Sequence, residues 1–227
     1  GSKEATEVFP KQYSEISACM AQIKSTMQQH EHILKEEGIL GRMLSDIDEA
    51  DWTDQIEIIG WLYQYYNTDL FNAIFDGDKS RKSLKAEDIP SATQLFTPDW
   101  AVRYMVENSL GKLWIEGHPN DELKEGWKYY LDEAEQDVDT QAKIEAIRAD
   151  YRNMKPQDIK VIDPCMGSGH ILVYAFDVLV QIYKTYGISE RDAAQSILAN
   201  NLYGLDIDDR AAQLAYFAVM MKARQYD

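Results

Sequence analysis

Residues 161–169 read Val-Ile-Asp-Pro-Cys-Met-Gly-Ser-Gly, and this stretch decides the fold. An apolar segment ends in Asp163 and Pro164, a glycine-rich turn follows, and a second apolar run begins at His170. This order predicts a strand, a tight loop and a helix. The backbone N–H groups of such a loop and of the helix N-terminus can approach a polar ligand closely.

A second short apolar run, Asn201-Leu202-Tyr203-Gly204-Leu205-Asp206, also ends in an acid. In nucleotide-binding α/β folds, a carboxylate at such a strand end accepts hydrogen bonds from the hydroxyls of a ribose. The two patterns together therefore indicate a pocket for an adenosine-containing cofactor. A dinucleotide site is disfavoured. Its G-x-G-x-x-G motif requires a glycine where this chain has Leu172, and it requires an acid about 20 residues later, whereas Asp206 comes much later.

Composition restricts the partners that the chain can have. The 227 residues carry 39 acids against 23 bases, a formal charge of −16, so the chain as a whole should repel DNA. A nucleic-acid surface would have to be a small local patch or lie outside this sequence. Two cysteines make no disulfide framework, and no apolar run approaches the ~18–20 residues that span a bilayer. We therefore expect a cytoplasmic protein without a membrane segment.

Hydrophobic periodicity predicts helices over most of the chain. Amphipathic helices are expected at 11–37 and at 53–75, the second with a buried stripe of Ile58, Trp61, Leu62 and Tyr65. A third helix should begin with Thr97 as its N-cap and Pro98 in its first turn, and an acidic helical insert should follow at about 120–154. Strands are expected at Ile159–Ile162 and 202–206, with helices ending at Gly187 and near Asn200 and a last helix from about Asp209.

Three motifs resemble those of adenine-specific DNA methyltransferases. Residues 163–169 resemble motif I, Gly204-Leu205-Asp206-Ile207-Asp208 resembles motif II, and Gln94-Leu95-Phe96-Thr97-Pro98 resembles motif X, which precedes motif I in this class. The stretches 94–114 and 167–172 are most similar to the methyltransferase of bacteriophage-exclusion (BREX) systems. The resemblance covers about 90–227. It implies an α/β fold with a mostly helical region at 1–89, followed at 90–227 by the first part of a Rossmann-like domain with an incomplete parallel sheet and a helical insert at about 117–157.

The resemblance also implies S-adenosyl-L-methionine as the cofactor. Asp163 would hold its amino group through water, Asp206 would hold its ribose, and the side chain of Ile207 would pack on its adenine. The backbone of the glycine loop would face the methionine part, and Thr97 would reach the methionine carboxylate. The residues that the resemblance assigns to the cofactor are Asp163, Pro164, Gly167, Gly169, Asp206, Ile207, Thr97 and Pro98.

Other polar residues near these motifs have simpler interpretations. Asp206, Asp208 and Asp209 could suggest a metal site, but Asp208 is better explained as the cap of the last helix and Asp209 as a complement to its dipole. No metal is therefore expected. His170 is expected to make a local hydrogen bond, and Cys165 is expected to be a small buried side chain rather than a nucleophile.

The catalytic motif of the family is missing from this sequence. None of the six prolines is adjacent to another, so the family's [Asp/Asn/Ser]-Pro-Pro-aromatic motif is absent and no catalytic residue is assigned. We expect an N-terminal fragment of a longer enzyme that binds cofactor, transfers no methyl group, and would contact duplex DNA through the missing part. An open sheet edge predicts self-association. The alternative is a non-catalytic helical scaffold that docks partner proteins of a defence complex.

Overall fold

A computed structural model describes Arg42, Ser45, Asp46 and residues 58–75, 84–86, 88–94 and 97–226 of the chain, without the side chains of residues 58, 59, 61 and 66. The chain divides into two compact units, Gly1–Gln55 and Ile56–Asp227, and the helices and strands named here belong to the second unit. The helix expected at 11–37, and residues 53–57 of the next one, lie outside the described residues.

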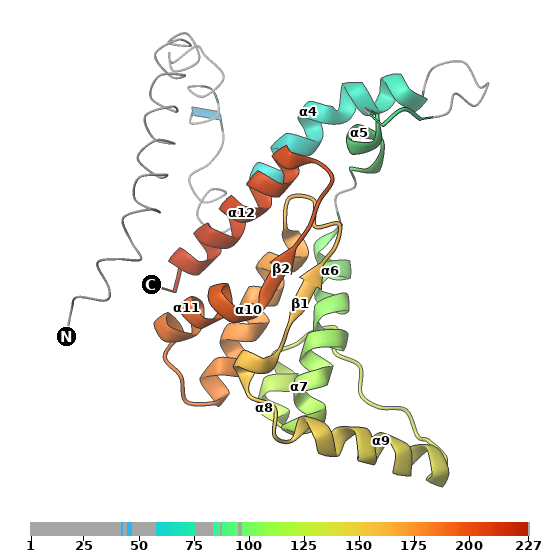
Figure 1. The fold of residues 1–227 in the computed structure, drawn as a ribbon, viewed down its shortest axis with the longest axis vertical. Helices are drawn as coiled ribbons and strands as arrows, with labels where there is room; N and C mark the ends of the chain where they lie inside the picture. The colour runs from blue at the N-terminus through green and yellow to red at the C-terminus, as the bar shows by residue number, and fades with distance from the viewer. Residues whose placement is uncertain are drawn as a thin grey trace, which may run out of the picture. The chain divides into compact units, whose positions relative to one another are not determined.

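The described unit is mostly helical, with one small sheet (Figure 1). The strands are β1 (Val161–Asp163) and β2 (Leu202–Gly204). The helices before the sheet are α4 (Ile58–Phe75), α5 (Ile89–Thr93), α6 (Asp99–Val106), α7 (Lys112–Gly117), α8 (Asp121–Glu125) and α9 (Val138–Tyr151). A π-helical turn, η2 (Glu107–Gly111), joins α6 to α7, and a 3-10 turn, η3 (Pro156–Asp158), precedes β1. The helices after β1 are α10 (His170–Thr185), α11 (Glu190–Asn200) and α12 (Asp209–Arg224).

The two strands are parallel neighbours, as the sequence predicts. Val161 is opposite Leu202 and Asp163 is opposite Gly204. Because parallel strands end at the same edge of a sheet, the loops that follow them lie side by side. The backbone N–H of Leu205 donates to the carbonyl of Asp163 at 2.9 Å, which continues the pairing beyond the strands. Both strands are shorter than expected, at three residues each.

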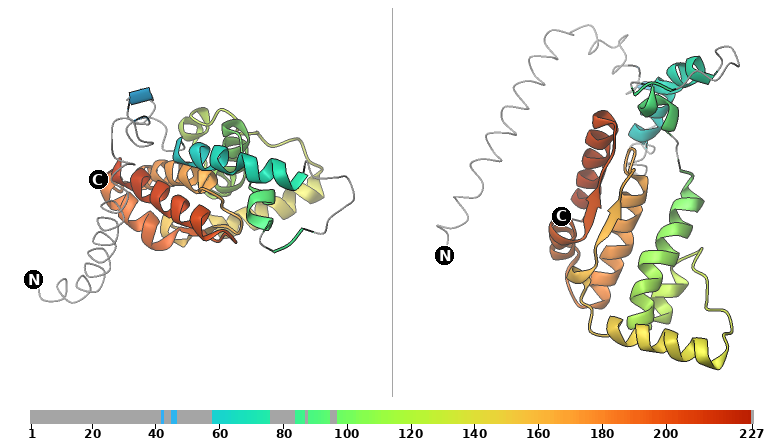
Figure 2. Two further views of the ribbon diagram at one scale, coloured as in Figure 1. Left: turned by 90° about the horizontal axis from the view of Figure 1, so that it is seen from above. Right: turned by 45° about the vertical axis from the view of Figure 1, so that its right-hand side comes forward.

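Helix α10 is the centre of the core, because nearly every side of it is apolar. It packs between α6 and α12 and also contacts α11 and both strands (Figure 2). Phe176, Leu179, Ile182 and Tyr183 on this helix are completely buried. This helical layer covers one face of the sheet. On the other face Ile162 and Tyr203 remain 61% and 47% exposed, so the sheet is covered on one side.

The helix ends near the sheet follow from their capping residues. The Ser189 hydroxyl accepts the N–H of Asp192 at 3.2 Å at the start of α11, and the Asp208 carboxylate accepts the N–H of Arg210 at 3.0 Å at the start of α12. Helix α10 ends just before Gly187, which has a left-handed φ of 81°. These contacts confirm the expected ends of the last three helices and the capping role of Asp208.

Three expectations about the earlier helices are wrong in detail. Helix α6 begins at Asp99 with Pro98 as its N-cap, and the Thr97 hydroxyl makes no capping bond, because Pro98 is extended at a ψ of 147°. Tyr65 of α4 is 77% exposed rather than buried. The acidic insert is two helices, α8 and α9, separated by an irregular segment at 126–137, which the buried Trp127 anchors to the core.

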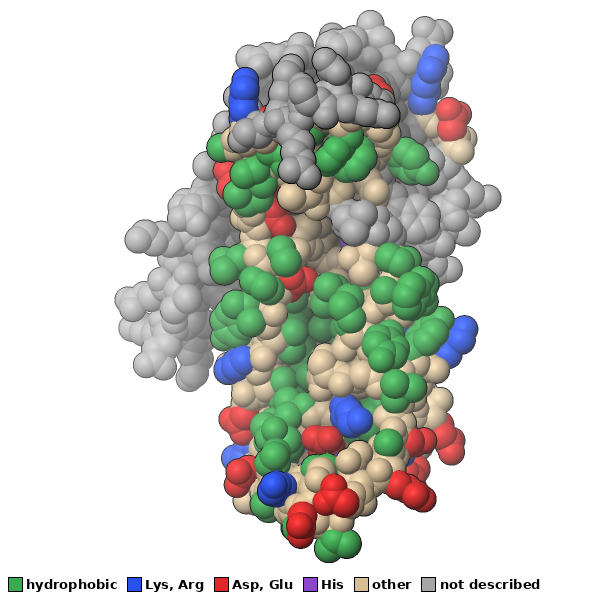
Figure 3. Space-filling view, turned by 90° about the vertical axis from the view of Figure 1, so that its right-hand side faces the viewer, with side chains coloured by type: hydrophobic (Ala, Val, Ile, Leu, Met, Phe, Trp, Pro, Cys, Tyr) green, Lys and Arg blue, Asp and Glu red, His purple; other side chains and the backbone are tan. Residues whose placement is uncertain are grey.

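The surface of the described unit is uneven in character. Hydrophobic side chains gather over the middle of the face shown in Figure 3, and charged side chains concentrate at its lower end, where Figure 1 places α9. The acid-rich segment 131–139 is exposed throughout. None of the described helices is long and apolar enough to span a membrane.

Candidate functional site

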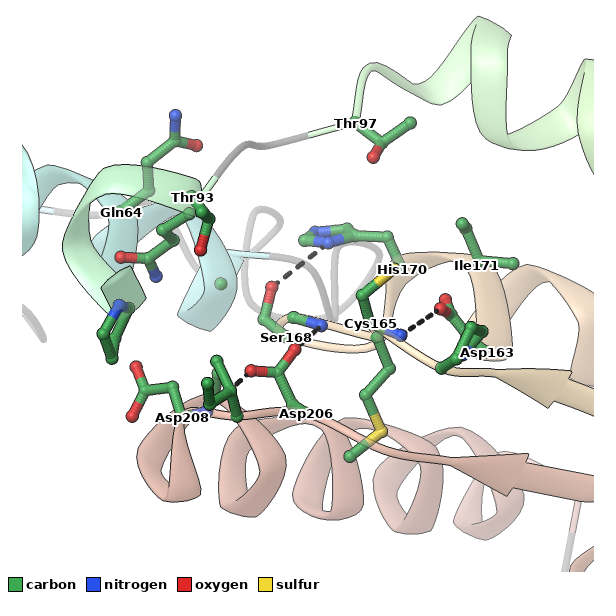
Figure 4. Close-up of a pocket in the computed structure, with 18 residues that line it drawn as sticks. Gln64, Thr93, Thr97, Asp163, Cys165, Ser168, His170, Ile171, Asp206 and Asp208 are labelled. Carbon is green, nitrogen blue, oxygen red and sulfur yellow. Dashed lines mark hydrogen bonds between the residues drawn. The ribbon is translucent and has the colours of Figure 1, made fainter. Parts of the chain in front are cut away.

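A cleft of about 380 Å³ opens where β1 and β2 end (Figure 4). Its walls come from α4 and α5 on one side, and from the glycine loop, the start of α10 and the loop after β2 on the other. Six of the residues assigned from sequence line it: Thr97, Asp163, Pro164, Gly167, Asp206 and Ile207. The structure thus brings together residues from three motifs that are up to 110 positions apart (207 − 97 = 110).

Asp206 connects the two loops at the floor of this cleft. Its Oδ2 accepts the backbone N–H of Gly167 at 2.7 Å, and its Oδ1 accepts that of Asp208 at 2.8 Å. An ionised carboxylate can accept about four hydrogen bonds. The two hydrogen bonds that Asp206 accepts fix the orientation of its carboxylate. They leave room for further donors, such as a pair of hydroxyls on a ligand.

Asp163 has a different environment, because it is 7% exposed at the end of β1. Its Oδ1 accepts the backbone N–H of Cys165 at 3.1 Å. Its Oδ2 is buried and has no hydrogen-bond partner among the described residues. Burying a carboxylate oxygen without a donor costs free energy, and a ligand that supplies an N–H group would offset that cost. The Asp163 Oδ2 atom can therefore accept a hydrogen bond from a donor that a ligand supplies.

The charge of the lining is one-sided. Asp163, Asp206 and Asp208 contribute three carboxylates, and the lining residues that the structure describes include no lysine or arginine. Opposite charges attract strongly where water is partly excluded. The cleft therefore favours a ligand that carries positive charge or several hydrogen-bond donors.

Gly167 and Gly169 of the loop have different structural roles. Gly167 has a φ of 53° and lines the cleft, and a Cβ atom built on it would meet nothing within 4 Å. Gly169 has a φ of 91° and lies outside the cleft lining, where a Cβ atom would come within 2.9 Å of the Cα and Cβ atoms of Ala215. Gly169 therefore allows the loop to pack against α12 rather than facing a ligand. Pro98 also lies outside the lining, at the start of α6.

Two neighbours of the loop can be compared with expectation. His170 makes a local contact, as expected, with its Nδ1 atom 3.2 Å from the Ser168 hydroxyl. Cys165 was expected to be buried, but it is exposed and lines the cleft. The physical reason is that its backbone N–H turns inward to Asp163, which directs the side chain outward. Within the described ranges, no group of three or more His, Cys, Asp or Glu side chains could hold a metal ion.

Sequence reasoning missed the wall formed by α4 and α5. Gly60 packs so closely on the glycine loop that a Cβ atom there would lie 2.5 Å from the Ser168 Oγ atom. Gln64, Thr93 and Gln94 also line the cleft. A signal was present: small or polar residues recur at 60, 63, 64 and 67, the spacing of one helix face. The apolar residues between them concealed this pattern.

The sequence of this chain is similar to those of known DNA methyltransferases. The model of the MmeI DNA-methyltransferase domain matches residues 134–227. The adenine-specific methyltransferase BrxX of Escherichia coli O9:H4 (strain HS) is 47% identical over 197 residues, which is 87% of this chain and 16% of BrxX. The adenine-specific methyltransferase PglX of Lacticaseibacillus casei (strain Zhang) is 48% identical over 202 residues, 83% of this chain and 16% of PglX. The chain therefore spans about one sixth of the length of these relatives.

Proposed function

The chain belongs to the family of the adenine-specific methyltransferases BrxX and PglX, and from this premise we propose that its cleft binds S-adenosyl-L-methionine. The observation that carries the proposal is the meeting of Asp163, Asp206 and Gly167 in one cleft. We further propose that the whole protein is an N6-adenine DNA methyltransferase of the phage-defence or restriction-modification type. In that protein, this chain would supply the cofactor-binding part.

Each proposed contact matches a property of the cleft. The unpartnered Oδ2 atom of Asp163 would accept the N–H groups of the methionine ammonium. Asp206, already oriented by two backbone N–H groups, would accept the ribose hydroxyls. The exposed side chain of Ile207 would gain burial by packing on the adenine ring. Thr97 would reach the methionine carboxylate with its hydroxyl.

The chemistry of transfer is divided between the cofactor and the protein. When bound, S-adenosyl-L-methionine supplies a methyl group on a positively charged sulfur atom. The residues of this chain would bind the cofactor, and the three cleft carboxylates would favour its positive charge. We propose that this chain does not transfer the methyl group by itself, because no two of its prolines are adjacent and a flipped adenine needs that motif to hold its amine. Duplex DNA would be contacted by other parts of the protein.

Calorimetric titration with S-adenosyl-L-methionine and its demethylated product tests the proposal. We expect binding by the unaltered chain, and at least a tenfold loss of affinity in Asp206→Ala and in Asp163→Asn, because each removes a charge-assisted hydrogen bond worth about 1.5–3 kcal/mol. Glu135→Gln, which changes an exposed acid outside the cleft, should bind as the unaltered chain does. With DNA added, a labelled cofactor should transfer no label.

Two results would contradict this proposal. Absence of binding at millimolar ligand would favour the scaffold alternative, in which the chain docks partner proteins of a defence complex. Equal affinities of Asp206→Ala and Glu135→Gln would place the ligand outside this cleft.

A further inference from the structure

Helix α4 carries a stripe of small and polar residues, two of which, Gly60 and Gln64, line the cleft. Gly60, Tyr63, Gln64 and Asn67 follow the spacing i, i+3, i+4 and i+7, which places them on one helix face. This inward face is small or polar, while Tyr65 on the same helix is exposed to solvent. A helix face that only packs against a core is usually apolar. The polar character of this face, with Gln64 in the cleft lining, points to a binding function.

Two residues of the stripe hold α4 against the site. Gly60 allows the helix backbone to approach the glycine loop, because a Cβ atom there would lie 2.5 Å from the Ser168 Oγ atom and 2.8 Å from the His170 Cε1 atom. The hydroxyl of Tyr63 donates to the Asp208 Oδ2 atom at 2.5 Å, across 145 positions of sequence. Burial and this hydrogen bond raise the pKa of Tyr63 above its ordinary value, so the hydroxyl keeps its proton at neutral pH. Because Asp208 follows Ile207, this contact brings α4 to the end of the cleft proposed to hold the adenine.

Asn67 fixes the next turn of the helix. Its side chain is buried, and its Nδ2 atom donates to the Gln94 Oε1 atom at 2.6 Å, which links α4 to the segment after α5. Tyr63 and Asn67 are therefore positioning residues, and Gln64 lies between them in the stripe. Gln64 lines the cleft, and its side-chain amide makes no hydrogen bond to another residue in the described part of the chain.

We propose that the Gln64 amide recognises the adenine ring of the bound cofactor. Each hydrogen-bonding edge of adenine presents the N6 amino donor beside a ring-nitrogen acceptor, N1 or N7. A glutamine amide presents one acceptor and two donors at a matching separation. Gln64 is thus the specificity-determining residue for the base. This inference rests on the proposed function, because it requires the adenosine to lie in this cleft.

A cycle of two proteins and two ligands tests the inference. The ligands are S-adenosylhomocysteine and its analogue with hydrogen in place of the 6-amino group, and the proteins are the unaltered chain and Gln64→Leu. We expect the unaltered chain to prefer the amino ligand by roughly tenfold, because the analogue lacks the N6 donor and leaves the Gln64 amide oxygen unpaired. In Gln64→Leu that preference should fall to about onefold. The affinity for the amino ligand should fall by more than about tenfold, because the variant also loses the bond to the ring nitrogen.

Tyr63→Phe is the control for a structural role. It removes the contact with Asp208 and should weaken both ligands by one common factor, leaving the preference for the amino ligand unchanged. Retention of the full preference in Gln64→Leu would overturn the inference, as would the lack of any preference in the unaltered chain, a measurement that needs no variant. Failure of both ligands to bind the unaltered chain would instead refute the proposed function.

Discussion

At the scale of single residues, the cleft is organised by carboxylates that bind the backbone. Asp206 accepts N–H groups from two separate loops, and Asp163 accepts one from its own. Such bonds fix the orientation of a carboxylate. The two carboxylates therefore face the cleft in defined positions before any ligand arrives, which reduces the ordering that binding would cost.

Two left-handed glycines, one in the glycine loop and one after α10, offer a matched pair of substitutions. Gly169→Ala and Gly187→Ala both place a Cβ atom at a left-handed backbone position, which costs about 1–2 kcal/mol. At Gly187 nothing lies within 4 Å, whereas at Gly169 the Cβ atom would meet Ala215 at 2.9 Å. Overpacking of this kind adds about 1–3 kcal/mol. We expect urea denaturation to show the larger loss of unfolding free energy for Gly169→Ala, and equal losses would mean that the loop moves freely away from α12.

The sequence predicted the carboxylates at the floor of the cleft better than the wall formed by α4 and α5. Asp163 and Asp206 end two apolar runs, and parallel strand ends meet at one sheet edge, so their convergence could be inferred. The direction of the Cys165 side chain could not be inferred, because it depends on a backbone hydrogen bond inside the loop. Gln64 was missed because apolar residues conceal the polar face of α4 in the sequence, and because tertiary packing determines that this face meets the cleft.

At the scale of elements, the π-helical turn η2 places a charged residue in the core. Glu107 is 1% exposed, yet its Oε1 atom accepts the Tyr174 hydroxyl at 2.7 Å and its Oε2 atom accepts the Tyr129 N–H at 2.6 Å. The extra residue in a π turn rotates the side chains that follow it. Glu107 thereby ties α10 to the irregular segment before α9. Buried groups of this kind stabilise a fold while every partner is present.

Tyr174→Phe tests this connection. Removing the hydroxyl leaves a buried carboxylate oxygen without its donor, which should lower the free energy of unfolding by about 1–3 kcal/mol. Tyr104→Phe is the control, because the Tyr104 ring is exposed and should change stability by less than about 0.5 kcal/mol. Chemical denaturation measures both. Equal stabilities would show that water replaces the lost donor.

The contribution of Tyr174 to the stability of the fold should depend on pH. Burial, with the hydrogen bond to Glu107, raises the pKa of Tyr174 above its ordinary value of 10.0. A tyrosine with a raised pKa stabilises the fold fully below its unfolded pKa, and that stabilisation is lost as the pH rises toward the folded value. The difference in stability between the unaltered chain and Tyr174→Phe should therefore shrink above about pH 10.

Element boundaries were predictable where capping residues determine them. Ser189 and Asp208 mark the starts of α11 and α12 through side-chain bonds to nearby N–H groups, and these are local interactions visible in sequence. Thr97 belongs to the same residue class but does not cap, because Pro98 takes the N-cap position. In α4 the exposed Tyr65 shows that apolar periodicity alone does not settle which side chains are buried.

At the scale of the whole molecule, charge and apolar surface act in opposite directions. The formal charge of −16 keeps copies of the chain apart through mutual repulsion. Against this, Ile162 and Tyr203 are paired across β1 and β2 on the uncovered face of a two-stranded sheet. A sheet with open edges and an exposed apolar face can pair with another copy. The balance depends on ionic strength, because salt screens the repulsion and leaves the apolar contact intact.

We therefore expect the chain to self-associate through this face, and more strongly as salt increases from about 10 mM to 150 mM, because the Debye length falls from about 30 Å to 8 Å. Sedimentation velocity over a concentration series measures it. Tyr203→Lys should shift the chain toward the monomer, since it adds charge to the face without removing a buried group. Ile147→Lys, at an exposed position on α9, should leave association unchanged. A monomer at high concentration and high salt would mean that the surrounding loops shield the sheet face sufficiently by themselves.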